Sequence, residues 1–276
     1  MSGRVDLHLH TTASDGFYTP KELVEKAVRA GFQAISITDH DTLEGYRTAL
    51  PIAKKSSLEL IPGVELSSEF QGKEVHILGY FVDPENNEFQ AALQFFTKER
   101  FYRAERIIKK LNSMGLALSI NEISDQYPGL PIGRPHIAEL LLKKEYVKSF
   151  QEAFYSYLGN NAPAYEKKVY ISPESAFRLI SAASGLSFIA HPGNMPEDVL
   201  KALIDAGCDG IEVMHPSLSN TQIKFLHELT NNYFLLRSGG SDFHGGKKKD
   251  DENFGRFYLR YDEVRAMKSR LTNIVA

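Results

Sequence analysis

Short apolar runs alternate with amphipathic stretches over most of this chain. The apolar runs predict strands at residues 5–9, 34–38, 58–62, 186–190, 210–213 and 234–238. The first helix has the clearest beginning, because Thr19, Pro20 and Glu22 provide an N-cap, a proline in the first turn and a capping-box glutamate. Strands and helices in repeated alternation predict an α/β fold with a parallel sheet.

Two features modify this alternation in the first third of the chain. Residues 64–70 and 74–81 flank the sequence Gln71-Gly72-Lys73 and predict a β-hairpin appended to the third strand. The helical stretch 43–53 contains Pro51, which predicts a break there because proline has no N–H to donate.

The alternation stops between residues 86 and 165. This segment contains a long charged helix that ends at Gly115, followed by shorter helical pieces around Asn121, Pro135 and Ser149. We therefore expect an inserted helical domain at 86–165, and a larger α/β domain formed by residues 1–85 and 166–276.

Composition and charge narrow the classes of partner. The 32 basic and 35 acidic residues nearly balance, so we expect no membrane partner and no stable duplex nucleic-acid partner. The single cysteine excludes an intrachain disulfide, and no apolar stretch is long enough to span a bilayer, which suits a cytoplasmic protein. We interpret the basic run 247–249 as a solvated loop, with a phosphate lid as the alternative.

Histidines and carboxylates collect at the ends of the predicted strands. His8 and His10 lie two apart on one strand, so both side chains project from the same face and can bind one ion. Asp15 follows the same strand, and similar side chains lie at or near the ends of other predicted strands at His40, Glu65, His76, His191, Asp242 and His244. A lone histidine is more often a surface or hydrogen-bonded core residue, but α/β barrels place active sites at these strand ends.

These nine side chains predict a centre with more than one metal. Six imidazoles and three carboxylates exceed the usual four to six donors of one ion, so at least two ions are implied. Mixed nitrogen and oxygen donors without thiolate favour Mn, Fe or Zn over Ca or Mg.

The motifs themselves resemble a known superfamily. The motifs are His8-Leu9-His10, Thr38-Asp39-His40, Gly63-Val64-Glu65, Ala190-His191-Pro192 and Gly240-Ser241-Asp242-Phe243-His244. In this order they resemble the successive motifs of the PHP (polymerase and histidinol phosphatase) superfamily, over roughly residues 4–82 and 172–261. The resemblance implies a distorted (β/α)7 barrel that forms the catalytic domain, with the small helical domain inserted.

The resemblance also implies a trinuclear site of divalent transition metals. The first ion would be held by His8, His10, Glu65 and Asp242. The second would be held by Glu65, His76 and His191, with Glu65 as a bridge. The third would be held by Asp15, His40 and His244.

Within this superfamily, the helical insertion and Gly133-Arg134-Pro135-His136 resemble stand-alone members that act on nucleotides. These include nucleoside 3′,5′-bisphosphate phosphatases and 5′-to-3′ exoribonucleases. The resemblance implies that Arg134 clamps a substrate phosphate, for which its planar fork is suited, although a surface ion pair is the alternative. His136 is a weaker candidate for substrate binding, and His215 could contact substrate or support a metal ligand.

The expected reaction is hydrolysis of a phosphate ester, because clustered metals supply both an activated water and neutralisation of phosphoryl oxygens. His191 or His215 would assist the leaving group as an acid. The expected substrates are nucleoside bisphosphates, AMP-type monophosphates or short 5′-phosphorylated oligonucleotides. The alternatives are a histidinol-phosphate phosphatase, a C–N hydrolase of the amidohydrolase kind and an inert metal-binding module.

Overall fold

The computed structural model describes residues 2–245 and 250–275, so the basic run 247–249 lies outside the described residues. One eight-stranded sheet has the strand order β7-β6-β5-β4-β3-β2-β1-β8. Its strands are β1 (Arg4–Leu9), β2 (Phe32–Ile37), β3 (Glu59–Phe70), β4 (Lys73–Tyr80), β5 (Leu186–Ile189), β6 (Gly210–Met214), β7 (Leu236–Gly239) and β8 (Leu259–Arg260).

Helices follow or connect these strands. They are α1 (Pro20–Arg29), α2 (Glu44–Ala53), α3 (Asn87–Ser113), α4 (Asn121–Ser124), α5 (Arg134–Lys143), α6 (Phe150–Ala153), the π-helix η1 (Phe154–Leu158), α7 (Pro173–Ala182), α8 (Glu197–Asp205), α9 (Asn220–Asn232) and α10 (Tyr261–Val275). The capping box predicted at Thr19 is present at the start of α1. The predicted break at Pro51 was wrong, since α2 continues to Ala53; this proline lies in the last turn, where it removes at most one helical hydrogen bond.

The sheet is a nearly closed, mixed barrel, which confirms the expected fold class. Strands β1, β2 and β3 are parallel, whereas β4 runs antiparallel to both β3 and β5. The barrel closes where β7 approaches β1. There, the Tyr80 hydroxyl donates to the Leu7 carbonyl on β1 at 2.9 Å and lies 2.7 Å from Ser238 Oγ on β7. A Cβ atom on Gly240 would lie only 2.5 Å from the His8 backbone nitrogen, so glycine allows the chain after β7 to approach β1.

The predicted hairpin is present, but it is an integral part of the barrel. Its first strand is continuous with the predicted third strand, so β3 extends over twelve residues. The sequence analysis missed β8 and α10, which lie at the β1 edge and beside β7. Both elements lie beyond the last strand that the apolar pattern predicted.

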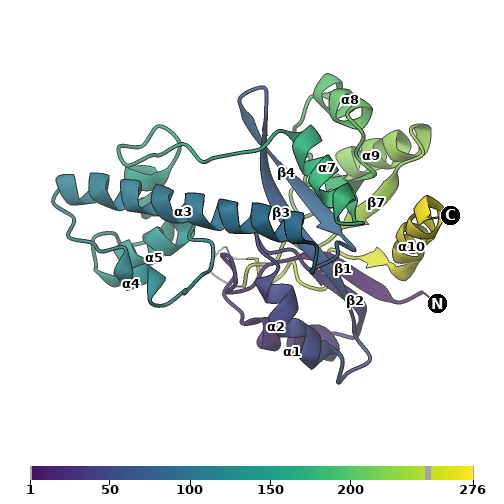
Figure 1. The fold of residues 1–276 in the computed structure, drawn as a ribbon, viewed down its shortest axis with the longest axis horizontal. Coiled ribbons are helices and arrows are strands. Elements are labelled where there is room, and N and C mark those ends of the chain that lie inside the picture. The colour runs from purple at the N-terminus through teal and green to yellow at the C-terminus, as the bar shows by residue number, and fades with distance from the viewer. Residues whose placement is uncertain (1, 246–249, 276) are drawn as a thin grey trace.

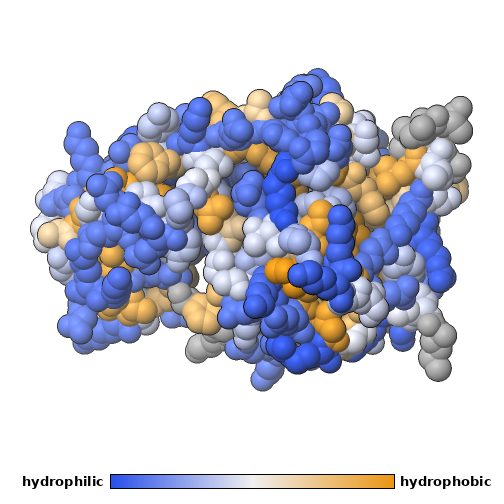
Figure 2. All heavy atoms as spheres, turned by 60° about the horizontal axis from the view of Figure 1, so that its bottom comes forward, coloured by the Kyte–Doolittle hydropathy of each residue, from blue (hydrophilic) through white to orange (hydrophobic). Residues whose placement is uncertain are grey.

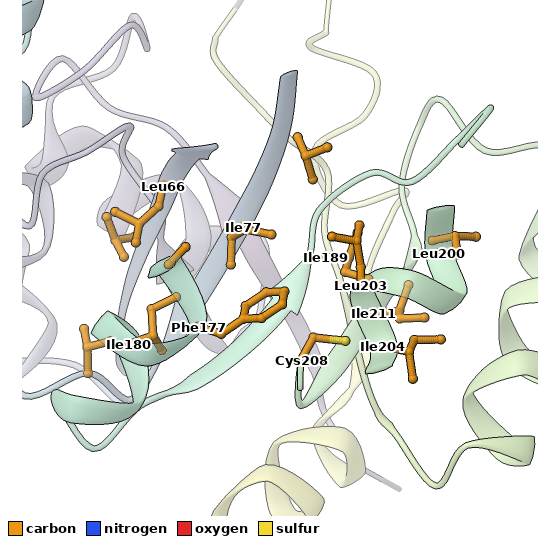
Figure 3. Close-up of a cluster of buried hydrophobic side chains, with 14 of the residues drawn as sticks. Leu66, Ile77, Phe177, Ile180, Ile189, Leu200, Leu203, Ile204, Cys208 and Ile211 are labelled. Atoms are coloured by element: carbon orange, nitrogen blue, oxygen red, sulfur yellow. The ribbon is translucent and has the colours of Figure 1, made fainter. Parts of the chain in front are cut away.

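The main hydrophobic core lies between the sheet and the helices α7, α8 and α9. Figure 3 shows Phe177 and Ile180 of α7 facing Ile77 of β4, while Leu203 of α8 lies near Ile211 of β6. Burial of these apolar side chains fixes the sheet, and the site residues project from its strands and the loops that follow them.

A separate hydrophobic cluster forms a helical lobe between residues 104 and 164. Figure 1 shows α3 running from the barrel to this lobe, where it lies beside α4 and α5. Phe89 and Leu93 near the start of α3 belong to the main core, whereas Ile107 and Leu111 belong to the lobe. The domain limits at 86 and 165 stay a prediction, because α3 belongs to both parts.

The surface view shows hydrophilic residues over most of the face in Figure 2, with a hollow between lobe and barrel. Among the described residues, no helix combines the length and apolar character that crossing a membrane requires.

Candidate metal centre and adjoining basic cavity

Glu65, on β3, lies at the middle of the histidine cluster. Its Oε2 atom is 3.3 Å from His8 Nε2 and 3.2 Å from His10 Nε2. The same oxygen is 3.2 Å from His40 Nδ1. Its Oε1 atom instead faces His76 Nδ1 at 2.8 Å and His191 Nε2 at 3.0 Å. The two oxygens of one carboxylate therefore face two different groups of imidazoles, which is the geometry of a bridging ligand.

The other two predicted carboxylates complete the cluster. Asp242 Oδ1 lies 3.3 Å from His8 Nε2 and 3.2 Å from His10 Nε2. Asp15 Oδ1 lies 3.3 Å from His244 Nε2 and 4.0 Å from His40 Nε2. The structure thus brings all nine side chains that the sequence singled out into one contiguous cluster.

These distances suit metal ligands. Two ligands held about 2.1 Å from one ion at a tetrahedral angle lie about 3.4 Å apart, close to the observed separations. Buried ring nitrogens of His10, His40, His215 and His244 also have no hydrogen-bond partner among the described residues. Buried polar atoms are normally satisfied, so nitrogens aimed into a carboxylate-lined space indicate room for cations. The donor set therefore fits divalent transition metals.

Electrostatics in the cluster agree with this interpretation. Burial would raise the pKa of Glu65, but His40, His76 and His8 outweigh it and hold the pKa well below its usual range. Burial would lower the pKa of His10, but the carboxylates of Asp242 and Glu65 raise it to about 9, so the space that this ring faces strongly favours positive charge. Glu65 is thus kept as a carboxylate, the state that binds metal.

Two site residues adopt backbone conformations that are rare for side chains of their size. His191, directly after β5, has φ of 27°, and Asp242, after β7, has φ of 48°. Such conformations cost about 1–3 kcal/mol and persist where the surroundings over-determine them. The loops after these strands are therefore shaped to direct both side chains into the cluster.

Glu212, on β6, accepts hydrogen bonds from two residues of the cluster, His8 and His191. It is fully buried, and its Oε1 accepts a hydrogen bond from His8 Nδ1 at 2.9 Å. Its Oε2 accepts one from the His191 backbone N–H at 2.6 Å. The sequence analysis did not assign Glu212 a role, although a charged residue within an apolar strand is a usable signal.

We expect Glu212→Gln to weaken metal binding by 10-fold to 100-fold, because His8 loses the carboxylate that fixes its ring orientation. Titration with Mn, followed by the loss of free metal in equilibrium dialysis, measures this. Glu228→Gln on α9 is a control that should leave metal affinity unchanged. Equal affinities for Glu212→Gln and the wild-type protein would show that Glu212 does not orient the ligand.

Asp6 and Asp39 are two further buried carboxylates that the sequence analysis did not assign. Asp39 accepts hydrogen bonds from Thr11 and Ser14, which hold the loop carrying Asp15. Asp6 accepts from the Ser241 backbone and hydroxyl, which hold the loop before Asp242. Burial raises the pKa of Asp6 to about 7. Both act by positioning the loops after β1 and β7.

A cavity of about 260 Å³ adjoins the candidate metal ligands and is strongly basic. Asp15, His40 and His76 form its barrel side. Its cationic lining residues are Arg100, Arg103, Arg134 and Lys168. Of these, the sequence analysis predicted only Arg134.

The positive charge in this cavity is only partly neutralised. Asp41 is paired with Arg100, whose Nη2 lies 2.5 Å from Asp41 Oδ2, and Glu74 Oε1 lies 3.3 Å from Lys168 Nζ. Among the described residues, Arg103 and Arg134 form no ion pair with a carboxylate. Burial and then Arg100 lower the pKa of Lys168 to about 8, and burial followed by Arg134 and Arg100 lowers that of Arg103 to about 10. Such crowding of cations favours a bound anion.

Arg134 lies at the start of α5, and its side chain is fixed on the lobe side of the cavity. Its Nη1 donates to the Leu158 carbonyl and to Asn160 Oδ1, both at 3.1 Å. Its guanidinium also lies 5.8 Å from the centre of the Phe154 ring. These contacts orient the guanidinium without neutralising its charge.

The other two predicted substrate-binding residues lie in different places. His136 lines the cavity, but its Nδ1 accepts a hydrogen bond from the Gly133 N–H at 2.9 Å. His215 lies on the barrel side, where its Nε2 is 3.3 Å from Asp242 Oδ2. Its Nδ1 accepts from the Ser217 N–H at 3.1 Å, which orients the ring with Nε2 toward Asp242.

Comparisons with known proteins agree with this chemistry. A family model described as the PHP domain matches residues 6–172, more than half of the chain. The chain is 34% identical over 250 residues to the 5′-3′ exoribonuclease of Haemophilus influenzae, which covers 88% of this chain and 91% of that protein. It is 32% identical over 248 residues to the 3′,5′-nucleoside bisphosphate phosphatase of Chromobacterium violaceum, with 87% of each chain covered.

A solved structure from Bifidobacterium adolescentis, named as a candidate metal-dependent phosphoesterase, has the same architecture. It matches with a TM-score of 0.89 at 29% identity and covers 96% of each chain. The match therefore extends over both the barrel and the helical lobe.

Proposed function

Since this chain belongs to the PHP family of metal-dependent phosphoesterases, we propose that it hydrolyses phosphate esters of nucleotides at a three-metal centre. The observation that carries the proposal is the basic cavity beside the metal ligands. A metal centre alone can serve any phosphate ester, whereas a second anion site beside it selects substrates with two phosphate groups.

In the proposed centre, the donor groups would hold three ions in three sites. The first consists of His8, His10, Glu65 and Asp242, and the second of His76 and His191 with the other oxygen of Glu65. The third consists of Asp15, His40 and His244, whose ligand atoms lie within 4.8 Å of one another. Imidazole and carboxylate donors without thiolate favour Mn, Fe or Zn.

When bound, the ions would supply an activated water and neutralise the phosphoryl oxygens. The chain's own groups then position the substrate. Arg134 and Arg103 hold a phosphate in the cavity, for which paired N–H donors of a guanidinium are suited. In its protonated form, His215 would give its Nε2 proton to the leaving group from beside Asp242, and it is better placed for this than His191, whose Nε2 faces Glu65.

A nucleotide that carries a 5′-phosphate and a phosphoryl group on its 3′-oxygen fits both anion sites. Its 5′-phosphate would enter the basic cavity while the 3′-phosphorus reaches the metals. A nucleoside 3′,5′-bisphosphate and a short 5′-phosphorylated RNA share this arrangement, because the 3′-phosphoryl group is free in one and continues the chain in the other. One site of this kind would serve both activities that are named for the two relatives.

Two alternatives are disfavoured by the same cavity. Histidinol phosphate has one phosphate and a cationic amine, so it leaves Arg103 and Arg134 without an anion and brings positive charge near them. A C–N hydrolase of the amidohydrolase kind would not need several cationic side chains beside its metals, because the bond that it cleaves carries no phosphate.

A substrate panel tests the proposal. The Mn-loaded protein is assayed with a nucleoside 3′,5′-bisphosphate, a 5′-phosphorylated dinucleotide, AMP and histidinol phosphate, and with amide substrates for release of ammonia. We expect phosphate or nucleotide release from the first two, abolished by a chelator and restored by Mn. Preferential turnover of histidinol phosphate, or release of ammonia alone, would refute the nucleotide assignment.

A further inference from the structure

A second cavity, of about 250 Å³, adjoins the candidate metal ligands His76 and His191. It lies between the β3–β4 turn, which projects beyond the sheet in Figure 1, and the loop before α8. His76 and Glu74 line both cavities, and His191 lines the second. The His76 ring therefore stands between the two spaces, with Nδ1 toward Glu65 and Nε2 3.1 Å from Glu74 Oε1.

The chemistry of this second cavity differs from that of the first. Its walls are formed by Phe70, Val75, Pro192, Met195 and Val199. Among the described residues that line it, Lys73 is the single lysine or arginine, and the carboxylate Glu74 lines the cavity as well. Apolar and aromatic walls suit a flat ring that stacks, whereas a phosphate would find little neutralising charge.

The walls are also held in place before any ligand arrives. The Met195 backbone N–H donates to the Pro192 carbonyl at 2.6 Å. The Gln222 side chain, from α9, donates to the Gly193 carbonyl at 2.7 Å and to Asn194 Oδ1 at 3.2 Å. Val75 is buried in the strand below. A loop tied to a neighbouring helix in this way forms a cavity with little ordering cost on binding.

We propose that this second cavity binds the nucleoside that follows the scissile phosphate in an oligonucleotide. The inference rests on the proposed function, because it places the scissile phosphorus at His76 and His191 and the 5′-phosphate in the basic cavity. The chain of the substrate then continues past His76 into the second cavity, whose walls are mainly apolar.

The bond that breaks in the proposed reaction determines which product keeps the phosphate. Water attacks phosphorus, a new P–O bond forms and the bond between phosphorus and the 3′-oxygen breaks. The departing 3′-oxygen takes a proton, and the first nucleotide leaves with its 5′-phosphate and a 3′-hydroxyl. The phosphate remains on the 5′-oxygen of the second nucleoside, which occupies the second cavity. A bisphosphate has no second nucleoside, so it leaves this cavity unused.

The test compares two substrates in the same Mn-loaded protein, a 5′-phosphorylated dinucleotide and the 3′,5′-bisphosphate of its first nucleoside. Val199→Phe fills the cavity and Phe70→Ala removes an aromatic wall. Each should lower the ratio of kcat/KM for the dinucleotide to kcat/KM for the bisphosphate by roughly tenfold or more. Val28→Phe, at an exposed position on α1, is the matched control and should leave the ratio unchanged.

The outcomes separate the two proposals. An unchanged ratio in both cavity variants, or an equal loss on both substrates, overturns the nucleoside subsite while nucleotide hydrolysis stands. A wild-type protein that hydrolyses neither substrate overturns the proposed function itself. Using two variants with opposite changes in volume keeps the test valid if one of them does not fold, as judged by circular dichroism.

Discussion

Glu65→Gln is expected to remove two metal ions together and to lower kcat at least a thousandfold. The carboxylate is shared, with Oε2 facing His8, His10 and His40 while Oε1 faces His76 and His191. An amide has one neutral oxygen and an NH₂ group, so it cannot bridge two cations. A thousandfold loss corresponds to about 4 kcal/mol of transition-state stabilisation. Elemental analysis of the purified variant, together with initial rates, measures both effects.

Glu69→Gln provides the matched control on the same strand. Glu69 pairs with Lys167 at 2.9 Å, so its loss should change neither metal content nor rate by more than twofold. Loss of a single ion from Glu65→Gln would show that the carboxylate does not bridge. Full metal content with full activity would remove Glu65 from the centre.

Arg134→Ala is expected to leave the metal content intact and to lower kcat/KM for a nucleoside bisphosphate by about 2–4 kcal/mol, or roughly 30-fold to 1000-fold. The guanidinium lines the cavity beside Asp15, His40 and His76. Arg134→Lys should recover only part of this loss, because an ammonium cannot reproduce a bidentate contact.

The division of that loss between KM and kcat locates the contact. A rise in KM alone means that Arg134 holds the non-reacting 5′-phosphate, as the proposed function requires. A fall in kcat means that it contacts the phosphoryl group being transferred. Arg178→Ala is a control at an exposed position on α7. Wild-type kinetics in Arg134→Ala would show that this side chain does not bind substrate.

The cluster of histidines and carboxylates could be predicted because its residues obey simple positional rules. His8 and His10 share one face of a strand, and Glu65, His191 and Asp242 lie on or directly after strands whose apolar cores are evident in the sequence. Parallel strands of a barrel bring such positions to one end. The pairing of Glu65 with both groups of imidazoles depends on the orientation of its two oxygens, which no spacing rule gives.

The basic cavity could be predicted only in part. Arg134 was identified through a motif, whereas Arg100 and Arg103 lie among many charges of a long helix, and Lys168 lies in a segment without regular structure. Their proximity depends on how α3 packs against the barrel and the lobe, where Asp41, from the loop after β2, pairs with Arg100. Such contacts between distant segments follow from tertiary packing and are not encoded by local periodicity.

The proposed subsite in the second cavity had no counterpart in the sequence analysis. Phe70 and Met195 are separated by more than a hundred residues and meet only because β4 pairs with both β3 and β5. The antiparallel position of β4 in the barrel brings the hairpin turn beside the loop after β5. The prediction of a hairpin appended to the third strand gave no pairing of β4 with β5 and so could not place this cavity.

A second anion site beside the metals is expected to select nucleotides with a 5′-phosphate. Its most direct test is the ratio of kcat/KM for a nucleoside 3′,5′-bisphosphate to kcat/KM for the matching nucleoside 3′-monophosphate, measured with the Mn-loaded wild-type protein at constant ionic strength. The two substrates undergo the same reaction at the metals and differ only in the group expected to contact Arg103 and Arg134. We predict a ratio of roughly 100 or more, the value expected for charge-assisted contacts to a buried phosphate. A ratio near one would contradict the account, because the basic cavity would then contribute nothing to the choice of substrate.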